Sequence, residues 1–105
     1  MAYRLADVDA SPELMLRITA IMKGAANDLA SLRGQGREMQ RRTMELLAAP
    51  TIDRAQVEAL RVERMQLQET VSRRMSQAMV DAAEVLTPEQ RARLAERTPR
   101  RHGGR

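Results

Sequence analysis

The chain contains no cysteine, no phenylalanine and no tryptophan, and only one tyrosine and one histidine among its 105 residues. Without cysteine, disulfides, thiol catalysis, cysteine-based zinc sites and iron–sulfur clusters are excluded. Stacking platforms for single-stranded nucleic acid need aromatic side chains, so the sequence does not predict that mode of binding. The single histidine, His102, is not enough for a transition-metal site without cysteine.

Strand-forming and membrane-spanning stretches are also scarce. Alanine, leucine and the eight methionines dominate the apolar residues, and this inventory favours helices over sheets. Because alanine buries little surface, a compact monomeric core would be thin, and long helices packed on each other and on a second chain fit better. No apolar run approaches the roughly 20 residues that cross a bilayer, and residues 1–10 lack the features of a signal peptide.

The formal net charge of +4 is unevenly distributed. Residues 91–105 hold six arginines and one glutamate, whereas residues 1–90 hold 12 basic and 13 acidic residues. The basic character therefore belongs to the end of the chain. The near-neutral body does not predict a nucleic-acid-binding protein.

Three helix-start signals divide the chain. In residues 11–13 (Ser-Pro-Glu) a hydroxyl cap precedes a proline and an acid. Further along, Thr51 or Asp53 can cap a helix, and Asp53 with Gln56 has capping-box spacing. Residues 87–90 (Thr-Pro-Glu-Gln) combine a cap, a proline at the first helical position and a glutamine at the third. Helices are therefore predicted over residues 12–48, 53–85 and 88–97.

Apolar residues recur every three or four positions along the two long segments, as expected for one helix packed along another. On the first segment this stripe comprises Leu14, Ile18, Ile21, Ala25, Leu29, Leu32, Gly36, Met39, Thr43 and Leu46. On the second it comprises Val57, Leu60, Arg64, Leu67, Val71, Met75, Ala78, Ala82 and Val85. Arg64 stands out there, because it must extend out of the stripe or pair with a carboxylate. Gly34 and Gly36 predict a kink or short break in the first helix.

A short link between two such helices predicts an antiparallel hairpin. The expected fold is thus all-α: a long antiparallel helical hairpin with a short C-terminal helix, assembled as a dimer. The domain organisation is an N-terminal extension (1–10), a hairpin domain (11–97) and a basic tail (98–105) that has no apolar pattern and is expected to be disordered.

No set of nucleophile, base and orienting group can be assembled, so the chain is not expected to be an enzyme, and no catalytic residue or cofactor is predicted. Pairs such as Glu38–Arg42 and Glu69–Arg73 indicate solvated helix faces. Methionine sulfur can hold copper(I), but methionine at helical spacing is normally a packing residue. No metal ligand is predicted.

Arginines gather on one part of the first segment, away from its apolar stripe. Three of them are spaced four residues apart, and a hairpin would bring them near Arg61 and Arg64 on the second segment. The surface is either a solvated face with local glutamate partners or one that attracts acidic or unfolded polypeptide. Exposed apolar residues beside it suit either promiscuous binding or a dimer interface. The residues predicted to bind a client or partner are Arg33, Arg37, Arg41, Arg61, Met39 and Met65.

Residues 86–91 (Leu-Thr-Pro-Glu-Gln-Arg) resemble the Leu-Thr-x-x-Gln motif of the Spy/CpxP family, through Leu86, Thr87, Pro88 and Gln90. That family includes periplasmic stress chaperones and heavy-metal sensors of the CnrX and ZraP kind. Family-like stretches also occur at residues 18–24, 44–47 and 52–53, so that the resemblance covers residues 11–97.

The resemblance implies a hairpin protomer that dimerises in the periplasm. Chaperone members hold unfolded clients on a basic and apolar surface without ATP, and sensor members bind metal through histidine-rich sites, which are missing here. The expected function is an ATP-independent periplasmic chaperone or stress-response protein. The alternative is a heavy-metal sensor or resistance regulator that acts on a signalling protein, and a third possibility is a structural dimerising module. Nucleic acid and membrane spans are not expected.

Overall fold

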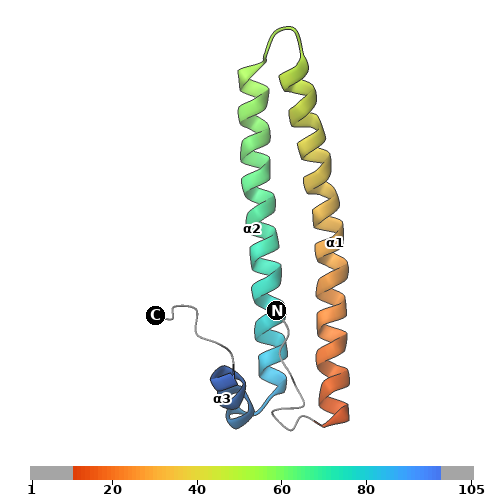
Figure 1. The fold of residues 1–105 in the computed structure, drawn as a ribbon, viewed down its shortest axis with the longest axis vertical. Coiled ribbons are helices and arrows are strands. Elements are labelled where there is room, and N and C mark those ends of the chain that lie inside the picture. The colour runs from red at the N-terminus through yellow and green to blue at the C-terminus, as the bar shows by residue number, and fades with distance from the viewer. Residues whose placement is uncertain (1–10, 98–105) are drawn as a thin grey trace. The chain divides into compact units, whose positions relative to one another are not determined.

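Three helices make up the part of the chain that the computed structural model describes, residues 11–97 (Figure 1). They are α1 (Pro12–Ala48), α2 (Arg54–Val85) and α3 (Pro88–Arg97), and no strand occurs among the described residues. The predicted all-α hairpin with a short third helix is confirmed. The predicted N-terminal extension and basic tail lie outside the described residues.

The first two helices begin at predicted caps. The Leu14 N–H donates to the Ser11 hydroxyl oxygen at 3.1 Å. At α2 the Gln56 N–H donates to Asp53 Oδ1 at 3.2 Å, and the Gln56 side-chain amide donates to Asp53 Oδ2 at 2.9 Å. Asp53, and not Thr51, is therefore the cap, and it satisfies one of the backbone donors that a helix start leaves open.

Helix α1 runs through Gly34 and Gly36 without interruption, so the short break that was one of the two predicted alternatives does not occur, and the kink stays a prediction. Glycine inside a helix costs about 1 kcal/mol relative to alanine, and packing against α2 overrides that preference. Gly36 lies on the packed stripe, where a Cβ atom would sit 3.5 Å from Leu67 Cδ2. This distance is an ordinary van der Waals contact, so the packing around Gly36 has room for an alanine side chain.

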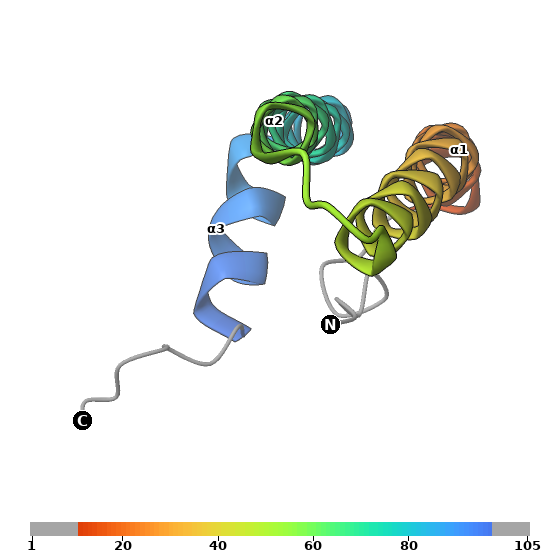
Figure 2. The same cartoon turned by 90° about the horizontal axis from the view of Figure 1, so that it is seen from above.

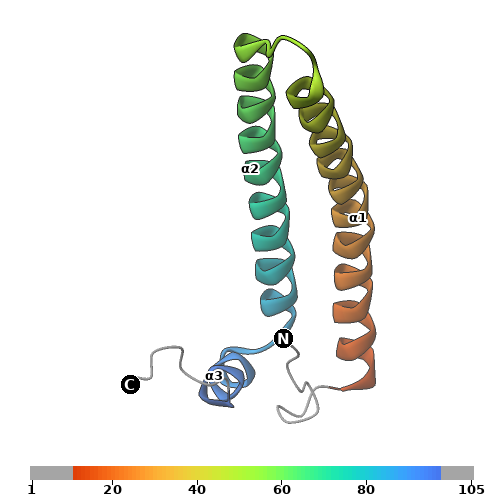
Figure 3. The ribbon, with the colours of Figure 1, turned by 45° about the horizontal axis from the view of Figure 1, so that its top comes forward.

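The chain divides into two compact units. One, here called the hairpin unit, comprises residues 24–77. In it, α1 and α2 run antiparallel side by side and are joined by residues 49–53 (Figures 1 and 3). The other, the corner unit, comprises among the described residues 11–23 and 78–97, with Ile18, Ala78 and Leu86 buried.

The predicted stripe of α1 is confirmed, because all ten of its positions are buried or half-buried. On α2, seven of the nine predicted stripe positions are buried or half-buried, whereas Arg64 and Met75 are exposed. Arg74 takes the place predicted for Met75: 24% of its side chain is exposed, and its Nε donates to Asp28 Oδ2 of α1 at 2.7 Å. The ion pair gives the Nε–H of the guanidinium a partner, while the apolar stem of the half-buried side chain packs between the helices.

Among the described residues, none of the helices has the length and apolar character needed to cross a membrane.

Candidate functional site

In the hairpin unit the surface beside the α1–α2 seam has two flanks with different chemistry. On one flank, ion pairs cross between the helices: Arg42 Nη2 lies 2.9 Å from Glu63 Oε1, and Arg74 Nε lies 2.7 Å from Asp28 Oδ2. We call this side the ion-paired flank. These contacts link residues far apart in sequence, so they show which turns of α1 and α2 lie level with each other.

The other flank carries arginine and methionine. Asp28 and Arg42 each precede a stripe residue of α1, whereas Arg33, Arg37 and Met44 each follow one. Since one residue turns a helix by about 100°, the two groups lie on opposite sides of the stripe. By the same periodicity, Arg61, Arg64 and Met75 of α2 lie on the side of the seam that carries the residues following the stripe of α1. This arginine–methionine flank comprises Arg33, Arg37, Met44, Arg61, Arg64 and Met75, all of them exposed.

The guanidinium groups of this flank are mostly unneutralised. No ion pair joins Arg33, Arg37 or Arg64 to any other residue of the described part. Met44 and Met75 beside them are 55% and 49% exposed. The flank therefore presents open positive charge next to flexible apolar side chains.

Arg61 differs from the other arginines of the flank. Its Nε and Nη2 donate to Glu58 Oε1 and Oε2 at 2.9 and 2.7 Å. This hydrogen-bonded pair lowers the pKa of Glu58 and raises the pKa of Arg61. Arg61 is thus held on its own helix and is less available to a ligand than Arg33 or Arg37.

Arg41 is also held by its own helix. It donates to Glu38 and to Glu45, and the Glu38 bond lowers the pKa of that carboxyl group and raises the pKa of Arg41. The predicted Glu38–Arg42 pair is therefore wrong, because Glu38 bonds Arg41 while Arg42 reaches across to Glu63. Helix periodicity puts Arg41 on the side of α1 that faces away from α2.

The six residues predicted to bind a partner consequently lie in four places. Met39 is half-buried in the seam, and Met65 is 59% exposed on the outer face of α2, the side turned away from α1. The arginine–methionine flank holds Arg33, Arg37 and Arg61. The outer side of α1 holds Arg41, the outer face of α2 holds Met65, and the seam holds Met39. Sequence reasoning placed Met75 in the stripe of α2. It placed Arg64 both in that stripe and beside Arg61 near the other arginines, and the structure exposes Arg64 and Met75 on the flank.

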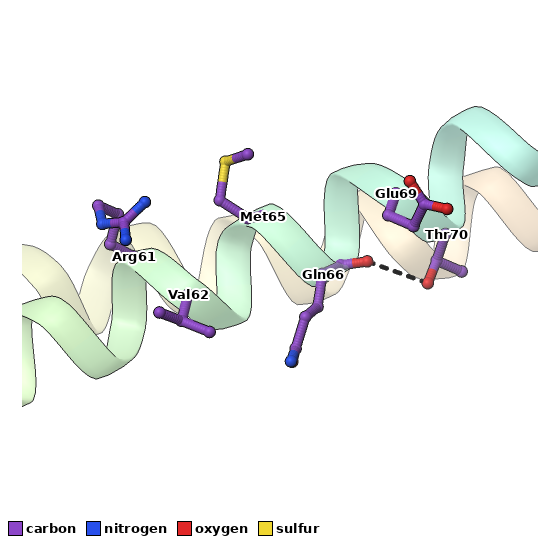
Figure 4. Close-up of a pocket in the computed structure, with 6 residues that line it drawn as sticks. All are labelled: Arg61, Val62, Met65, Gln66, Glu69 and Thr70. Carbon is purple, nitrogen blue, oxygen red and sulfur yellow. Dashed lines mark hydrogen bonds between the residues drawn. The ribbon is translucent and has the colours of Figure 1, made fainter.

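A shallow groove runs along the outer face of α2 (Figure 4). Within it, the Thr70 hydroxyl donates to the Gln66 carbonyl oxygen at 3.1 Å. Because one helix supplies the whole lining, the groove is an open surface and not an enclosed ligand site. Its lining residues are Arg61, Val62, Met65, Gln66, Glu69 and Thr70.

The Leu-Thr-x-x-Gln stretch forms the corner between α2 and α3, where the chain turns sharply (Figure 2). Leu86 is 5% exposed, and its N–H donates to the Ala83 carbonyl oxygen at 3.0 Å. Thr87 and Gln90 exchange two hydrogen bonds, and an Arg91 guanidinium N–H donates to the same Ala83 oxygen at 3.3 Å. These contacts end one helix and start the next, which is a structural role.

Among the described residues, acidic side chains do not gather into a cluster that could hold a metal ion. No group of three histidine, cysteine, aspartate or glutamate residues in the described part can hold a metal ion. Hydrogen bonds lower the pKa values of Glu38, Asp53 and Glu58, whereas a general acid at neutral pH needs a raised one. Soft thioether sulfur is in contrast plentiful on the surface. The exposed methionines are Met15, Met22, Met44, Met65, Met75 and Met79.

Comparison with curated proteins and with solved structures gives no match. A family model described as heavy-metal resistance matches residues 2–93. That family contains helical Leu-Thr-x-x-Gln proteins of the CnrX and ZraP kind, in agreement with the resemblance carried by residues 86–91. Since the match extends over most of the sequence, the chain belongs to the heavy-metal resistance family.

Proposed function

We propose that this chain acts in heavy-metal resistance as a regulator that binds a polypeptide partner on its arginine–methionine flank. The observation that carries the proposal is that Arg33, Arg37 and Arg64 have no ion-pair partner in the described part of the chain. On the opposite side of the seam, by contrast, charges are paired between the helices. Guanidinium groups without partners bind carboxylates, often with two hydrogen bonds each. Methionine side chains adapt to apolar surfaces of different shape.

In the form that the family match favours, the partner is a signalling protein whose activity changes under metal stress. Titration calorimetry with nickel, cobalt, zinc and copper(I) tests whether the chain itself senses metal. Micromolar binding that survives deletion of residues 98–105, which removes His102, supports a sensor. Absence of binding to all four metals contradicts direct sensing, and leaves partner binding to be measured separately.

A second candidate is ATP-independent chaperone activity toward unfolded or partly folded proteins, which the exposed methionines of the flank favour. The test is whether the chain, at stoichiometric amounts, suppresses aggregation of a chemically denatured client. No suppression at several-fold excess rejects this candidate. Calorimetry and aggregation therefore separate the two forms of the proposal.

The flank itself is tested with Arg33→Gln and Arg37→Gln. Arg41→Gln is the matched control, since it removes the same charge from the same helix at a position already held by glutamates. Each flank variant is expected to weaken partner or client binding about two- to fivefold and to reduce its salt dependence, with the control unchanged. Equal effects of all three variants would mean that net charge, and not this flank, drives binding.

We further propose that the chain works in the periplasm, as a homodimer, and without enzymatic activity or a nucleic-acid partner. The periplasmic location and the dimer are supported by the resemblance at residues 86–91, and the dimer also by the small buried core. Sedimentation velocity across a concentration series measures the oligomeric state. Fractionation of cells that express the complete gene measures the location.

A further inference from the structure

Two methionines of the corner unit are exposed beside its seam, one from each long helix. Met22 of α1 is 47% exposed, and Met79 of α2 is 59% exposed. Methionine at helical spacing normally fills a core. Both of these side chains stay about half-open to solvent in the described chain, so packing within it does not account for them.

Met22 and Met79 lie on the same side of the seam. Met22 directly follows Ile21, a half-buried stripe residue of α1, and Met79 directly follows Ala78, which is 2% exposed. One residue turns a helix by about 100°. Because α1 and α2 run antiparallel (Figure 3), the residue that follows a stripe position turns toward the same side on both helices.

The two methionines are also level with each other along the helices. The 2.7 Å contact between Arg74 Nε and Asp28 Oδ2 gives the register of α2 against α1. Met22 lies six residues before Asp28, a rise of about 9 Å, and Met79 lies five residues after Arg74, about 7.5 Å in the same direction. Their backbone positions therefore differ by only about 1.5 Å along the helix axes.

The seam between them is lined by small side chains. Ala78 is buried and Ala82 is half-buried, and alanine lets neighbouring helices approach toward the short end of the usual separation of about 8–10 Å between axes. Methionine is unbranched and has three rotatable side-chain bonds. One thioether sulfur from each helix can therefore reach a common point above the seam.

The chemistry of a thioether pair selects one class of ion. Thioether sulfur is a soft, uncharged ligand that favours copper(I), whereas harder divalent ions prefer imidazole and carboxylate. Silver(I), a soft ion of the same charge, takes the same ligands without a redox step. No group of histidine, cysteine, aspartate or glutamate in the described residues would recruit a harder ion instead.

We infer that Met22 and Met79 form a site for a soft monovalent cation, copper(I) or silver(I), with one sulfur ligand from each helix. Two thioethers leave part of the coordination open to solvent, which favours reversible binding. The inference rests on the proposed role in heavy-metal resistance and deepens it, because it names the class of metal and its ligands. The site uses none of the residues of the arginine–methionine flank.

Metal titration of the full chain tests the site. Silver nitrate is added in chloride-free buffer and followed by calorimetry, and copper(I) is offered without oxygen against a chromogenic chelator. Each is expected to bind at one ion per chain with a Kd in the micromolar range or below. Absence of saturable binding for both ions overturns the inference.

Conservative variants assign the ligands. Met22→Leu and Met79→Leu keep the apolar volume and remove the sulfur, and each is expected to raise the silver Kd by more than about tenfold. Met65→Leu is the matched control, since Met65 is as exposed as Met79 but lies on the outer face of α2. It is expected to leave the Kd within about twofold of the original. Equal effects of all three variants overturn the inference, and circular dichroism confirms that helicity is retained.

Nuclear magnetic resonance of the chain with labelled methionine methyl groups gives a second readout. The signals absent from Met22→Leu and Met79→Leu identify the two methyl groups. These two signals are expected to shift first as silver(I) is added, before that of Met65. Simultaneous shifts of all exposed methionines would show unspecific binding to thioethers and overturn the inference.

The flank variants keep this site and the proposed function apart. Arg33→Gln is expected to leave the silver Kd within about twofold of the original, and Met22→Leu to leave partner binding without metal unchanged. If silver(I) does not bind while Arg33→Gln still weakens partner binding, the inference fails and the proposed function stands. If silver(I) binds and the flank variants change nothing, the reverse holds.

Discussion

Thr87 and Gln90 hydrogen-bond each other in both directions. The Gln90 N–H donates to Thr87 Oγ1 at 3.1 Å, and the Thr87 N–H donates to Gln90 Oε1 at 2.9 Å. This reciprocal arrangement satisfies two backbone donors at the start of α3, beside the buried Leu86. The motif on which the family resemblance rests is thus a device for holding a corner of the fold.

Removing the cap should destabilise the protein. Thr87→Ala is expected to cost about 1 kcal/mol, which lowers the melting temperature by about 4–8 °C in a chain of this size. Thr87→Ser retains the hydroxyl and should remain close to the original. Thermal denaturation followed by circular dichroism measures both, and an equal loss in the two variants would show that the threonine methyl group, and not the hydroxyl, matters.

Alanine in place of the glycines of α1 should stabilise the protein. The Cβ of Gly34→Ala would meet only the end of the Arg37 side chain, at 3.7 Å, and that of Gly36→Ala would lie in ordinary contact with Leu67. Each substitution is expected to add about 0.5–1 kcal/mol to the free energy of unfolding, measured with urea. Gly36→Leu should destabilise, because a larger side chain must displace Leu67. Loss of stability in both alanine variants would mean that α1 needs to bend there.

Neighbouring arginines of α2 should respond differently to truncation. Arg74→Ala removes a stem packed in the seam and leaves Asp28 without its partner, so it is expected to cost about 1–2 kcal/mol. Arg73→Ala removes an exposed side chain paired within its own helix and should cost no more than about 0.5 kcal/mol. Urea denaturation of the two variants compares them, and equal losses would contradict the position assigned to Arg74.

Acid should weaken α1 through Glu38. The hydrogen bond from Arg41 lowers the pKa of the Glu38 carboxyl from its usual 4.5. Because the unfolded chain then binds the proton more readily, this contribution is present above about pH 4.5 and is lost as the pH falls through the lower folded pKa. Melting temperatures between pH 6 and pH 2 measure the loss. Glu38→Gln and Arg41→Gln should both flatten the dependence, and added salt should reduce it.

Helix ends were predictable because their causes are local. Ser11, Asp53 and Thr87 bond backbone groups three residues along the same chain, so a few letters of sequence carry the whole signal. The stripe of α1 was predictable for a similar reason, since its spacing is regular over ten positions.

What the sequence could not supply depends on contacts between distant residues. Arg74, and not Met75, lies in the seam because Asp28 stands opposite it, 46 positions away. Gly36 stays helical because Leu67 packs on it. Arg41 and Arg42 give a third example. Each has a carboxylate at helical spacing on α1, and the rotation of α1 about its axis decides that Arg42, and not Arg41, reaches across to α2.

The core of the described chain consists of few side chains, and this affects how the molecule opens. Its fully buried apolar residues are Ala25 and Leu60 in the hairpin unit and Ile18, Ala78 and Leu86 in the corner unit. With no second layer behind them, water gains access to a helical turn as soon as that turn separates. Backbone amides should therefore exchange their hydrogens with solvent through small local openings, with protection rising gradually from each helix end. Docking of a second molecule on α2 would then slow exchange most in the turns that it covers.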